Sequence, residues 1–260
     1  MLIKKSEIIE LSDGIRKAIA GETFDPRDHK EGVMSILKND IYTLINIEKE
    51  QRNSAEQEKE QLSIYLADIA HQLKTPITSM NLMVNLLKDA PEEKQKEFIF
   101  HMKRELANME WMVSALLKMS KIDAGVVEFR RGETNSSSLI REALIPLEIL
   151  LDINNQSVEI RNDTKINCDQ RWTVEALTNI LKNASECSKE NGIIWVDSGE
   201  NPIYSWISVT DSGTGIPRER IASLFRRFEN SQNENGYGIG LPLALSIMKG
   251  QNGDIEIEPG

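Results

Sequence analysis

Residues 33 to 124 contain no glycine and only two prolines, and this stretch constrains the fold more than any other feature of the chain. It is rich in Leu, Met, Glu, Lys and Gln, which have high helix propensity. Pro91, between Ala90 and Glu92, is the natural point for a break. The stretch therefore predicts two long helices that meet at Pro91.

Apolar residues recur along both predicted helices at alternating steps of four and three, the pattern of a coiled-coil seam. The seams consist of Leu62, Leu66, Ile69, Leu73, Pro76, Met80, Met83 and Leu87 in the first helix and Ile99, Met102, Leu106, Met109, Val113 and Leu116 in the second. One hairpin buries such seams poorly, whereas two hairpins complete a four-helix bundle. We therefore expect an antiparallel hairpin that forms a homodimer.

The regions on either side of this hairpin differ in character. Glycine returns at Gly125, and from there short β-branched runs alternate with helical patterns, which predicts a mixed α and β region. Upstream, Leu11, Ile15 and Ile19 predict a short amphipathic helix. Residues 51–61, just before the hairpin, are nearly all polar and fit either a solvated helix or a flexible linker.

Composition excludes several classes of protein. With 260 residues and 40% hydrophobic content, the chain is long enough for one large domain or two smaller ones. Its net charge of −10 makes nucleic acid an improbable partner. Cys168 and Cys187 are too few for a disulfide scaffold or a thiolate metal cluster, which fits a reducing, cytoplasmic setting. No apolar run approaches the roughly 20 residues of a membrane span.

His71 occupies the heptad position furthest from the seam and should therefore face solvent. Asp68, His71, Thr75 and Thr78 form one polar stripe, and Pro76 is expected to kink the helix or loosen its hydrogen bonding. An imidazole is largely neutral at pH 7, with a lone pair that can attack an electrophile. The alternative is an ordinary surface histidine, the interpretation that we give to His29 and His101.

Three later segments have the features of one nucleotide site. Asn179 and Asn183 share a helix face, where their carboxamide oxygens can bind Mg²⁺, although they can equally be solvent-facing or capping residues. The sequence DSGTGIP, from Asp211 to Pro217, suits hydrogen bonding to an exocyclic amine, or a simple turn before a helix. In GYGIGLPLA, glycines open a helix where phosphate oxygens can bind, although this motif alone is weak evidence.

Taken together, residues 60 to 258 resemble the cytoplasmic part of a bacterial sensor histidine kinase. HQLKTP resembles the H box, LTNILKNA the N box, DSGTGIP and GYGIGL the two glycine boxes, and LFRRF the F box. The resemblance implies a dimeric antiparallel helical hairpin, forming a four-helix bundle, followed by a Bergerat-type α/β sandwich that binds ATP. The implied domains are a HAMP-like helical segment and linker at 1–59, a dimerisation and phosphotransfer hairpin at 60–125 and the ATP-binding domain at 126–260.

The resemblance also implies roles for individual residues. His71 would be the phosphoacceptor, with Gln72 beside it and Thr75 at the position used to dephosphorylate the partner. Asn183, helped by Asn179, would hold Mg²⁺, and Asp211 would bind the adenine amino group. The residues implied to make room for the base or to contact the lid and phosphates are Gly213, Gly215, Arg227, Gly236, Gly238 and Gly240.

The same resemblance implies partners and a location. The phosphoryl group would pass from His71 to an aspartate of a response regulator receiver domain. A HAMP-like start usually follows a transmembrane helix, so the resemblance implies anchoring at the inner face of the cell membrane through a region outside this sequence.

The chain departs from the family at several positions. Gln72 stands where an acidic general base is typical, and an amide cannot accept a proton at neutral pH. Asp68 is a candidate to replace it as an orienting carboxylate. Glu186 and Cys187 replace a common lysine and aromatic residue, and Asn230 replaces a frequent lid arginine. The alternatives are therefore a degenerate nucleotide-binding scaffold, or another ATPase of this fold such as a gyrase-like or chaperone enzyme.

Overall fold

The computed structural model describes residues 5–19, 22–27, 33–88, 90–228 and 238–258. The chain divides into two compact units, Met1–Ala67 and Asp68–Gly260, and each unit is described by itself. Within the described ranges, every helix is either too short or too polar to span a bilayer.

The first unit is helical and consists of α1 (Lys5–Ile19) and the beginning of α2 (Val33–Leu86). Leu11, on the predicted apolar face of α1, is buried. The ring of Phe24 occupies the space that a Cβ atom at Gly14 would need, 2.1 Å from its position, so glycine permits this contact. Residues 51–60 lie within α2 and are exposed, so the polar stretch forms a solvated helix and the flexible-linker alternative is wrong.

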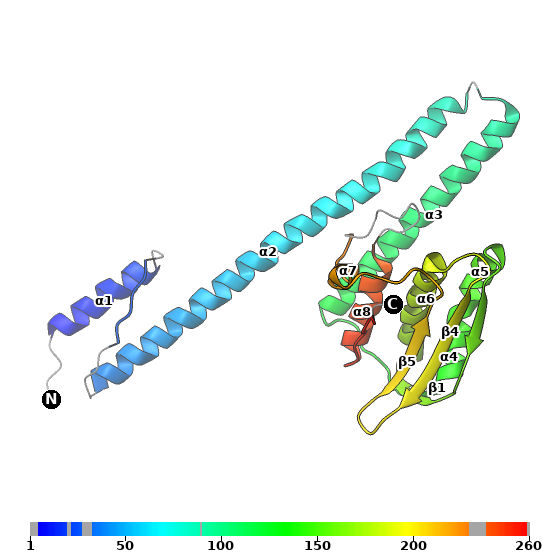
Figure 1. Ribbon diagram of the computed structural model, residues 1–260. Coiled ribbons are helices and arrows are strands. Elements are labelled where there is room, and N and C mark those ends of the chain that lie inside the picture. The colour runs from blue at the N-terminus through cyan, green and yellow to red at the C-terminus, as the bar shows by residue number, and fades with distance from the viewer. Residues whose placement is uncertain (1–4, 20–21, 28–32, 89, 229–237, 259–260) are drawn as a thin grey trace. The chain divides into compact units, whose positions relative to one another are not determined.

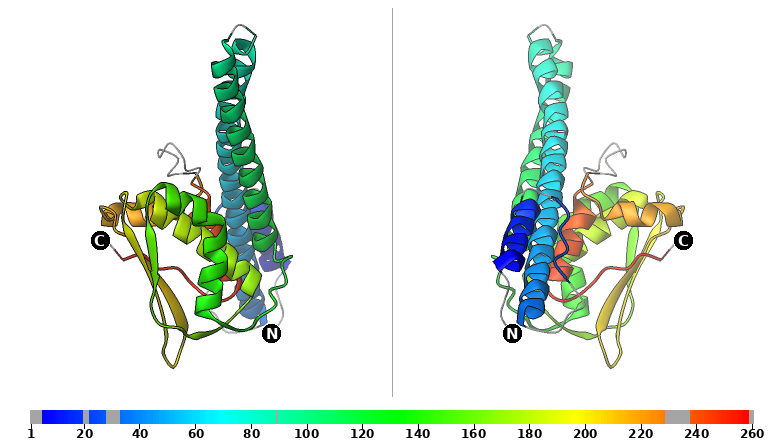
Figure 2. Two further views of the ribbon diagram at one scale, coloured as in Figure 1. Left: turned by 90° about the vertical axis from the view of Figure 1, so that its right-hand side faces the viewer. Right: turned by 90° about the vertical axis from the view of Figure 1, so that its left-hand side faces the viewer.

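The second unit begins with a helical hairpin made from the rest of α2 and from α3 (Glu92–Asp123). Pro91 immediately precedes α3, and the break predicted there is confirmed. The helix α2 continues through Pro76 without interruption. Figure 2 shows α3 beside the later part of α2, and Ile69 and Leu73 of α2 pack against a buried cluster that includes Met112 of α3.

The α/β region follows the hairpin and forms a layer of helices on a layer of strands (Figure 1). Its elements are β1 (Gly132–Asn135), α4 (Ser136–Leu144), the 3-10 turn η1 (Ile145–Leu147), α5 (Glu148–Ile153), β2 (Ser157–Ile160), β3 (Lys165–Cys168), α6 (Gln170–Cys187), β4 (Ile193–Glu200), β5 (Ser205–Thr210), α7 (Arg218–Leu224) and α8 (Gly240–Gly250). This arrangement confirms the predicted mixed α/β sandwich.

The strands form two sheets. In one sheet β4 lies between β2, to which it is parallel, and β5, to which it is antiparallel. In the other, β1 and β3 pair in antiparallel fashion. Val196 of β4 is paired with Val209 of β5, and alternate residues of β4 point toward the helices, as the two-residue period of a strand requires.

Two apolar clusters hold the second unit together. The inner core joins α4, α5 and α6 to the strands, and its buried residues are Leu139, Ile140, Ala143, Leu147, Leu151, Cys168, Leu177, Leu181, Ala184, Ile194 and Val196. The bridging core joins α3 to α6 and α8, and its buried residues are Met112, Ala115, Met119, Ala176, Phe228, Ile239, Leu243, Ala244 and Ile247.

Candidate nucleotide and phosphotransfer site

Helix α6 is the element around which the predicted nucleotide residues gather. It begins at a capped N-terminus, where the backbone N–H of Trp172 donates to the carboxylate of Asp169 (3.2 Å). Leu177 and Leu181 lie in the inner core, whereas Ala176 lies in the bridging core. Because both sides of α6 are buried against other elements, the helix is held firmly enough to position polar side chains.

Asn179 is buried, and the structure brings it to the first turn of α8. Its side-chain Nδ2 donates to the carbonyl oxygen of Glu175 (2.8 Å), which leaves Oδ1 as the atom able to bind a ligand. A Cβ atom at Gly240 would lie 3.1 Å from that Oδ1. The glycine at position 240 therefore permits the close approach of α8 to Asn179.

Asn183 lies one turn further along α6 and is half-buried. In the part of the chain that the structure describes, its carboxamide forms no hydrogen bond. The same described residues contain no group of three or more His, Cys, Asp or Glu side chains arranged to hold a metal. Amide oxygens are hard donors that suit Mg²⁺, so the donor set at Asn179 and Asn183 fits the predicted ion.

The turn after β5 brings Asp211 to the end of α6. The backbone N–H of Gly213 donates to Asp211 Oδ1 (2.7 Å), which fixes the carboxylate on its own turn. Burial raises the pKa of the Cys187 thiol, and the nearby carboxylates of Asp211 and Glu186 raise it further. Asp211 and the last turn of α6 are therefore neighbours, as a shared base-binding region requires.

Gly213 lies against the end of α6. A Cβ atom at this position would lie 2.5 Å from the carbonyl oxygen of Cys187, so glycine makes room for the α6 backbone, and its role beside the base stays a prediction. Gly215 has a positive φ of 76° and supplies a left-handed turn that side chains rarely adopt. Its proximity to the base remains a prediction.

The glycines before α8 are partly described. Gly238 has a positive φ of 64°, and its carbonyl oxygen accepts a hydrogen bond from the backbone N–H of Phe228 (3.1 Å). This bond joins Phe228, at the end of the F box, to the second glycine box itself. Gly236 and Asn230 lie outside the described residues.

Arg227, for which a phosphate contact is predicted, contacts the hairpin in this structure. Its guanidinium forms an ion pair with the carboxylate of Asp123, at the end of α3 (2.5 Å). The two residues are 104 positions apart in the sequence, so local patterns gave no signal of this contact.

The predicted phosphoacceptor, His71, is exposed on α2. Its neighbours Ile69 and Leu73 pack against the bridging core, which directs the imidazole to another side of the helix. The hydroxyl of Thr75 donates to the carbonyl oxygen of His71 (3.4 Å), and Gln72 is half-buried. The structure thus confirms the exposure expected for a histidine at the outer heptad position.

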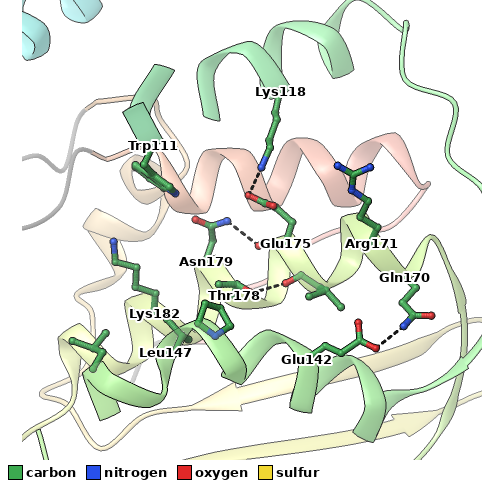
Figure 3. Close-up of a pocket in the computed structure, with 13 residues that line it drawn as sticks. Trp111, Lys118, Glu142, Leu147, Gln170, Arg171, Glu175, Thr178, Asn179 and Lys182 are labelled. Carbon is green, nitrogen blue, oxygen red and sulfur yellow. Dashed lines mark hydrogen bonds and ion pairs between the residues drawn. The ribbon is translucent and has the colours of Figure 1, made fainter. Parts of the chain in front are cut away.

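A pocket of about 970 Å³ lies between α3, the α4–η1 segment and α6 (Figure 3). Lys118 of α3 forms an ion pair with Glu175 of α6 (2.8 Å), and the ammonium of Lys182 lies 5.2 Å from the centre of the Trp111 ring. No local sequence pattern predicts this group of residues, because they come together only when α3 packs on the α/β region.

Comparison with known proteins places these elements in a family. Residues 61–125 match the His Kinase A (phospho-acceptor) domain, and residues 168–260 match the histidine kinase-, DNA gyrase B- and HSP90-like ATPase family. Together the two matches span more than half of the chain.

Curated relatives and a solved structure agree with these matches. Sporulation kinase C of Bacillus subtilis (strain 168) is 28% identical over 221 residues, which cover 82% of this chain and 49% of the relative. Sensor histidine kinase WalK of the same strain is 29% identical over 206 residues, covering 74% of this chain and 33% of the relative. The chain thus spans half or less of the length of these relatives.

The solved structure is that of histidine kinase ThkA in complex with response regulator protein TrrA. It is similar with a TM-score of 0.61 and 27% identity, over 78% of this chain and 60% of the other. The helical hairpin, the α/β region and both family matches lead to one conclusion: the chain belongs to the bacterial two-component sensor histidine kinases.

Proposed function

We propose that this chain is an ATP-dependent protein histidine kinase that phosphorylates its own His71. The observation that carries the proposal is the placement of His71, which is exposed on a helix whose flanking residues Ile69 and Leu73 are anchored in the bridging core. A histidine held in this way presents its imidazole to solvent on a fixed backbone. The approach of Asn179 to Gly240 also supports the proposal, because it brings two of the predicted nucleotide motifs together.

The chemistry requires one bond to form and one to break. An unprotonated nitrogen of His71 attacks the γ-phosphorus, the bond from that phosphorus to the β–γ bridging oxygen breaks, and ADP leaves. Asn183 and Oδ1 of Asn179 would hold Mg²⁺, which neutralises charge on the phosphates when bound. Gln72 can orient the imidazole by accepting its N–H hydrogen bond, but it cannot remove the proton, so the proton goes to water or to another base.

A second candidate function is a nucleotide-binding scaffold without efficient phosphotransfer. Two observations favour it. Gln72 lacks the proton affinity of a carboxylate. Glu186, at the end of α6, forms an ion pair with Lys182 (3.7 Å), so part of the positive charge of Lys182 is already neutralised. Whether His71 becomes labelled decides between the two.

We also propose that the phosphoryl group passes to an aspartate of a response regulator, and that the chain promotes its removal from that aspartate by hydrolysis. The match to the phosphoacceptor family and the similarity to ThkA, solved with its response regulator, support the transfer. Thr75, whose hydroxyl is hydrogen-bonded to the His71 carbonyl, is the residue proposed for dephosphorylation.

A homodimer is proposed on the exposed apolar side chains of the hairpin. Leu82, Leu106 and Leu117 are each more than half exposed, and a second hairpin would cover such residues. Size-exclusion chromatography with light scattering tests this directly, because a monomer at micromolar concentration would contradict it.

The kinase proposal is tested by incubation with γ-labelled ATP and Mg²⁺. We expect acid-labile, alkali-stable label on the chain, which is the behaviour of a phosphoramidate. The label should disappear in His71→Ala and Asn183→Ala and persist in His101→Ala, a matched control on α3 whose side chain is 34% exposed. Label that persists in His71→Ala would overturn the assignment of the phosphoacceptor.

Gln72→Glu separates the two candidate functions. If the missing base limits the rate, the substitution should raise autophosphorylation by up to about 100-fold, the lower end of the range for a general base. A chain that binds ATP but is labelled neither as wild type nor as Gln72→Glu would be the scaffold.

A further inference from the structure

The ion pair between Asp123 and Arg227 connects the end of the hairpin to the segment that follows α7. The Nη2 atom of Arg227 lies 2.5 Å from Asp123 Oδ2, and the two side chains are 24% and 46% exposed. Exposed ion pairs usually contribute little to stability, partly because ordering two long side chains costs conformational entropy. The residues around this pair reduce that entropic cost.

Each partner of this pair is adjacent to a residue of the bridging core. Ile122 packs against that core, and Phe228 is buried in it at 6% exposure. The backbones of Asp123 and Arg227 are therefore held in place by their neighbours. The contact depends on the packing of α3 against the α/β region, and it is lost when the two separate.

Phe228 also connects this pair to the predicted phosphate-binding turn. Its backbone has a φ of 66°, an unusual value for a bulky residue, and its N–H bonds to the carbonyl of Gly238 (3.1 Å). Gly238 is two residues before Gly240, which approaches Asn179. Arg227 therefore begins beside the turn where phosphates are expected, while its guanidinium is turned to a carboxylate of the hairpin.

A carboxylate and a phosphate both offer negatively charged oxygens to a guanidinium. The Arg227 side chain is held at Asp123 through its Nη2 atom, so it must leave that carboxylate to reach phosphates bound elsewhere. A residue that must contact phosphate in one state and carboxylate in another is a two-state element, and its equilibrium shifts with the difference between the two affinities.

We propose that Asp123 is a positioning residue that holds Arg227 away from the nucleotide, and that Arg227 exchanges the Asp123 carboxylate for the β- and γ-phosphates of ATP when α3 releases the α/β region. The exchange rests on the proposed kinase function for its consequence in catalysis. The predicted effect on nucleotide binding does not rest on it, since that effect depends only on whether Asp123 holds the Arg227 guanidinium.

The chain offers a matched test of the release and a matched control. Lys118–Glu175 (2.8 Å) also joins α3 to the α/β region, so Lys118→Gln weakens the packing of α3 while the partner of Arg227 stays in place. Any gain in ATP binding that Lys118→Gln gives should disappear in the Arg227→Ala background. Lys249–Asp254 (2.7 Å) lies within the segment around the end of α8, so Asp254→Asn removes a surface carboxylate whose ion-pair partner is Lys249 and not Arg227.

The experiment measures the Kd for Mg-ATP and for AMP, together with the autophosphorylation rate, on the full chain. Asp123→Asn should tighten ATP binding about two- to five-fold, the equivalent of losing a weak competing ion pair, and leave AMP binding unchanged because AMP lacks the β- and γ-phosphates. The rate should rise by a similar factor. Arg227→Ala should weaken ATP binding, and adding Asp123→Asn to it should have no further effect.

Several outcomes would overturn the exchange: an unchanged Kd for ATP in Asp123→Asn, an equal gain from Asp123→Asn in the Arg227→Ala background, or an equal gain in Asp254→Asn. Failure of the proposed function is a separate result. If no variant is labelled at His71 but Asp123→Asn still tightens ATP in an Arg227-dependent way, the exchange stands and the kinase proposal falls.

Discussion

The two cores of the second unit are built from different side chains, and the difference indicates which contacts are permanent. The inner core consists mainly of Leu, Ile, Val and Ala from elements of the α/β region itself. The bridging core takes Met112 and Met119 from α3 and places them against α8. Branched aliphatic side chains fill a space in a few fixed rotamers, whereas methionine adapts to a changing surface.

Helix α6 belongs to both cores and so connects them. Leu177 and Leu181 face the inner core, while Ala176 is buried in the bridging core and Ile180 packs against it. Asn179 and Asn183 lie on the same helix. A change in either core can therefore alter the positions of the nucleotide residues. Loss of packing in the inner core should unfold the α/β region, whereas loss of packing in the bridging core should only detach α3.

The largest effect is expected in the inner core. Leu181 is 1% exposed, and Leu181→Ala should lower the free energy of unfolding by about 2–5 kcal/mol, because a cavity remains where the side chain is lost. Urea denaturation followed by circular dichroism measures this. Ile149→Ala, at a position of α5 that is 76% exposed, is the control, and a loss at Leu181 no larger than that at Ile149 would remove the distinction between core and surface.

Met119→Ala should lower the free energy of unfolding less than Leu181→Ala does, and it should weaken the packing of α3 on α8 more. Met119 is 1% exposed, but its partners lie on α8, across the contact with the hairpin. We expect a loss of about 2 kcal/mol, at the low end for a buried methionine, with the α/β region still folded and able to bind ATP. Hydrogen exchange should report faster exchange in α3 and unchanged protection in β4. An equal loss of protection in α3 and in β4 would mean that the two cores unfold as one cooperative unit.

Gly213→Ala tests the end of α6, beyond both cores. The new Cβ would lie 2.5 Å from the Cys187 carbonyl oxygen, and a backbone atom cannot rotate away, so a cost of about 1–2 kcal/mol and weaker ATP binding are expected. Gly132→Ala provides the comparison, because a Cβ there meets nothing within 4 Å. Thermal unfolding of the two variants gives the measurement, and similar melting temperatures would show that the turn at Asp211 can move aside.

The elements that sequence predicted are those determined by short spacing. The glycine-free stretch and the heptads predicted both helices of the hairpin, and steps of four placed Asn179 and Asn183 on one helix. The contacts between Asp123 and Arg227, and between Gly213 and the Cys187 carbonyl, join residues far apart in the chain. Such contacts are set by how helices pack on the sheet, and no local pattern encodes that geometry.

The smallest expected effect is a pH dependence at Glu186, near the end of α6. Burial raises the pKa of this carboxyl above its ordinary value of 4.5, against the opposing influence of Lys182. A carboxyl whose pKa is higher in the folded chain favours folding below the unfolded pKa, and that contribution is lost as pH rises through the folded pKa. At pH 7 the folded chain therefore carries an ionised group that would be better solvated after unfolding.

Glu186→Gln removes that charge and should stabilise the chain at pH 7, by less than about 1 kcal/mol because the Lys182 ion pair is lost with it. The gain should shrink as pH falls toward 4, because a growing fraction of the carboxyl is then protonated in both states. Melting temperatures between pH 4 and pH 8 provide the test, with Glu190→Gln at an exposed position as the baseline. A gain that is constant across this range would assign the effect to packing, and a loss at pH 7 would show that Lys182 stabilises Glu186 more than burial destabilises it.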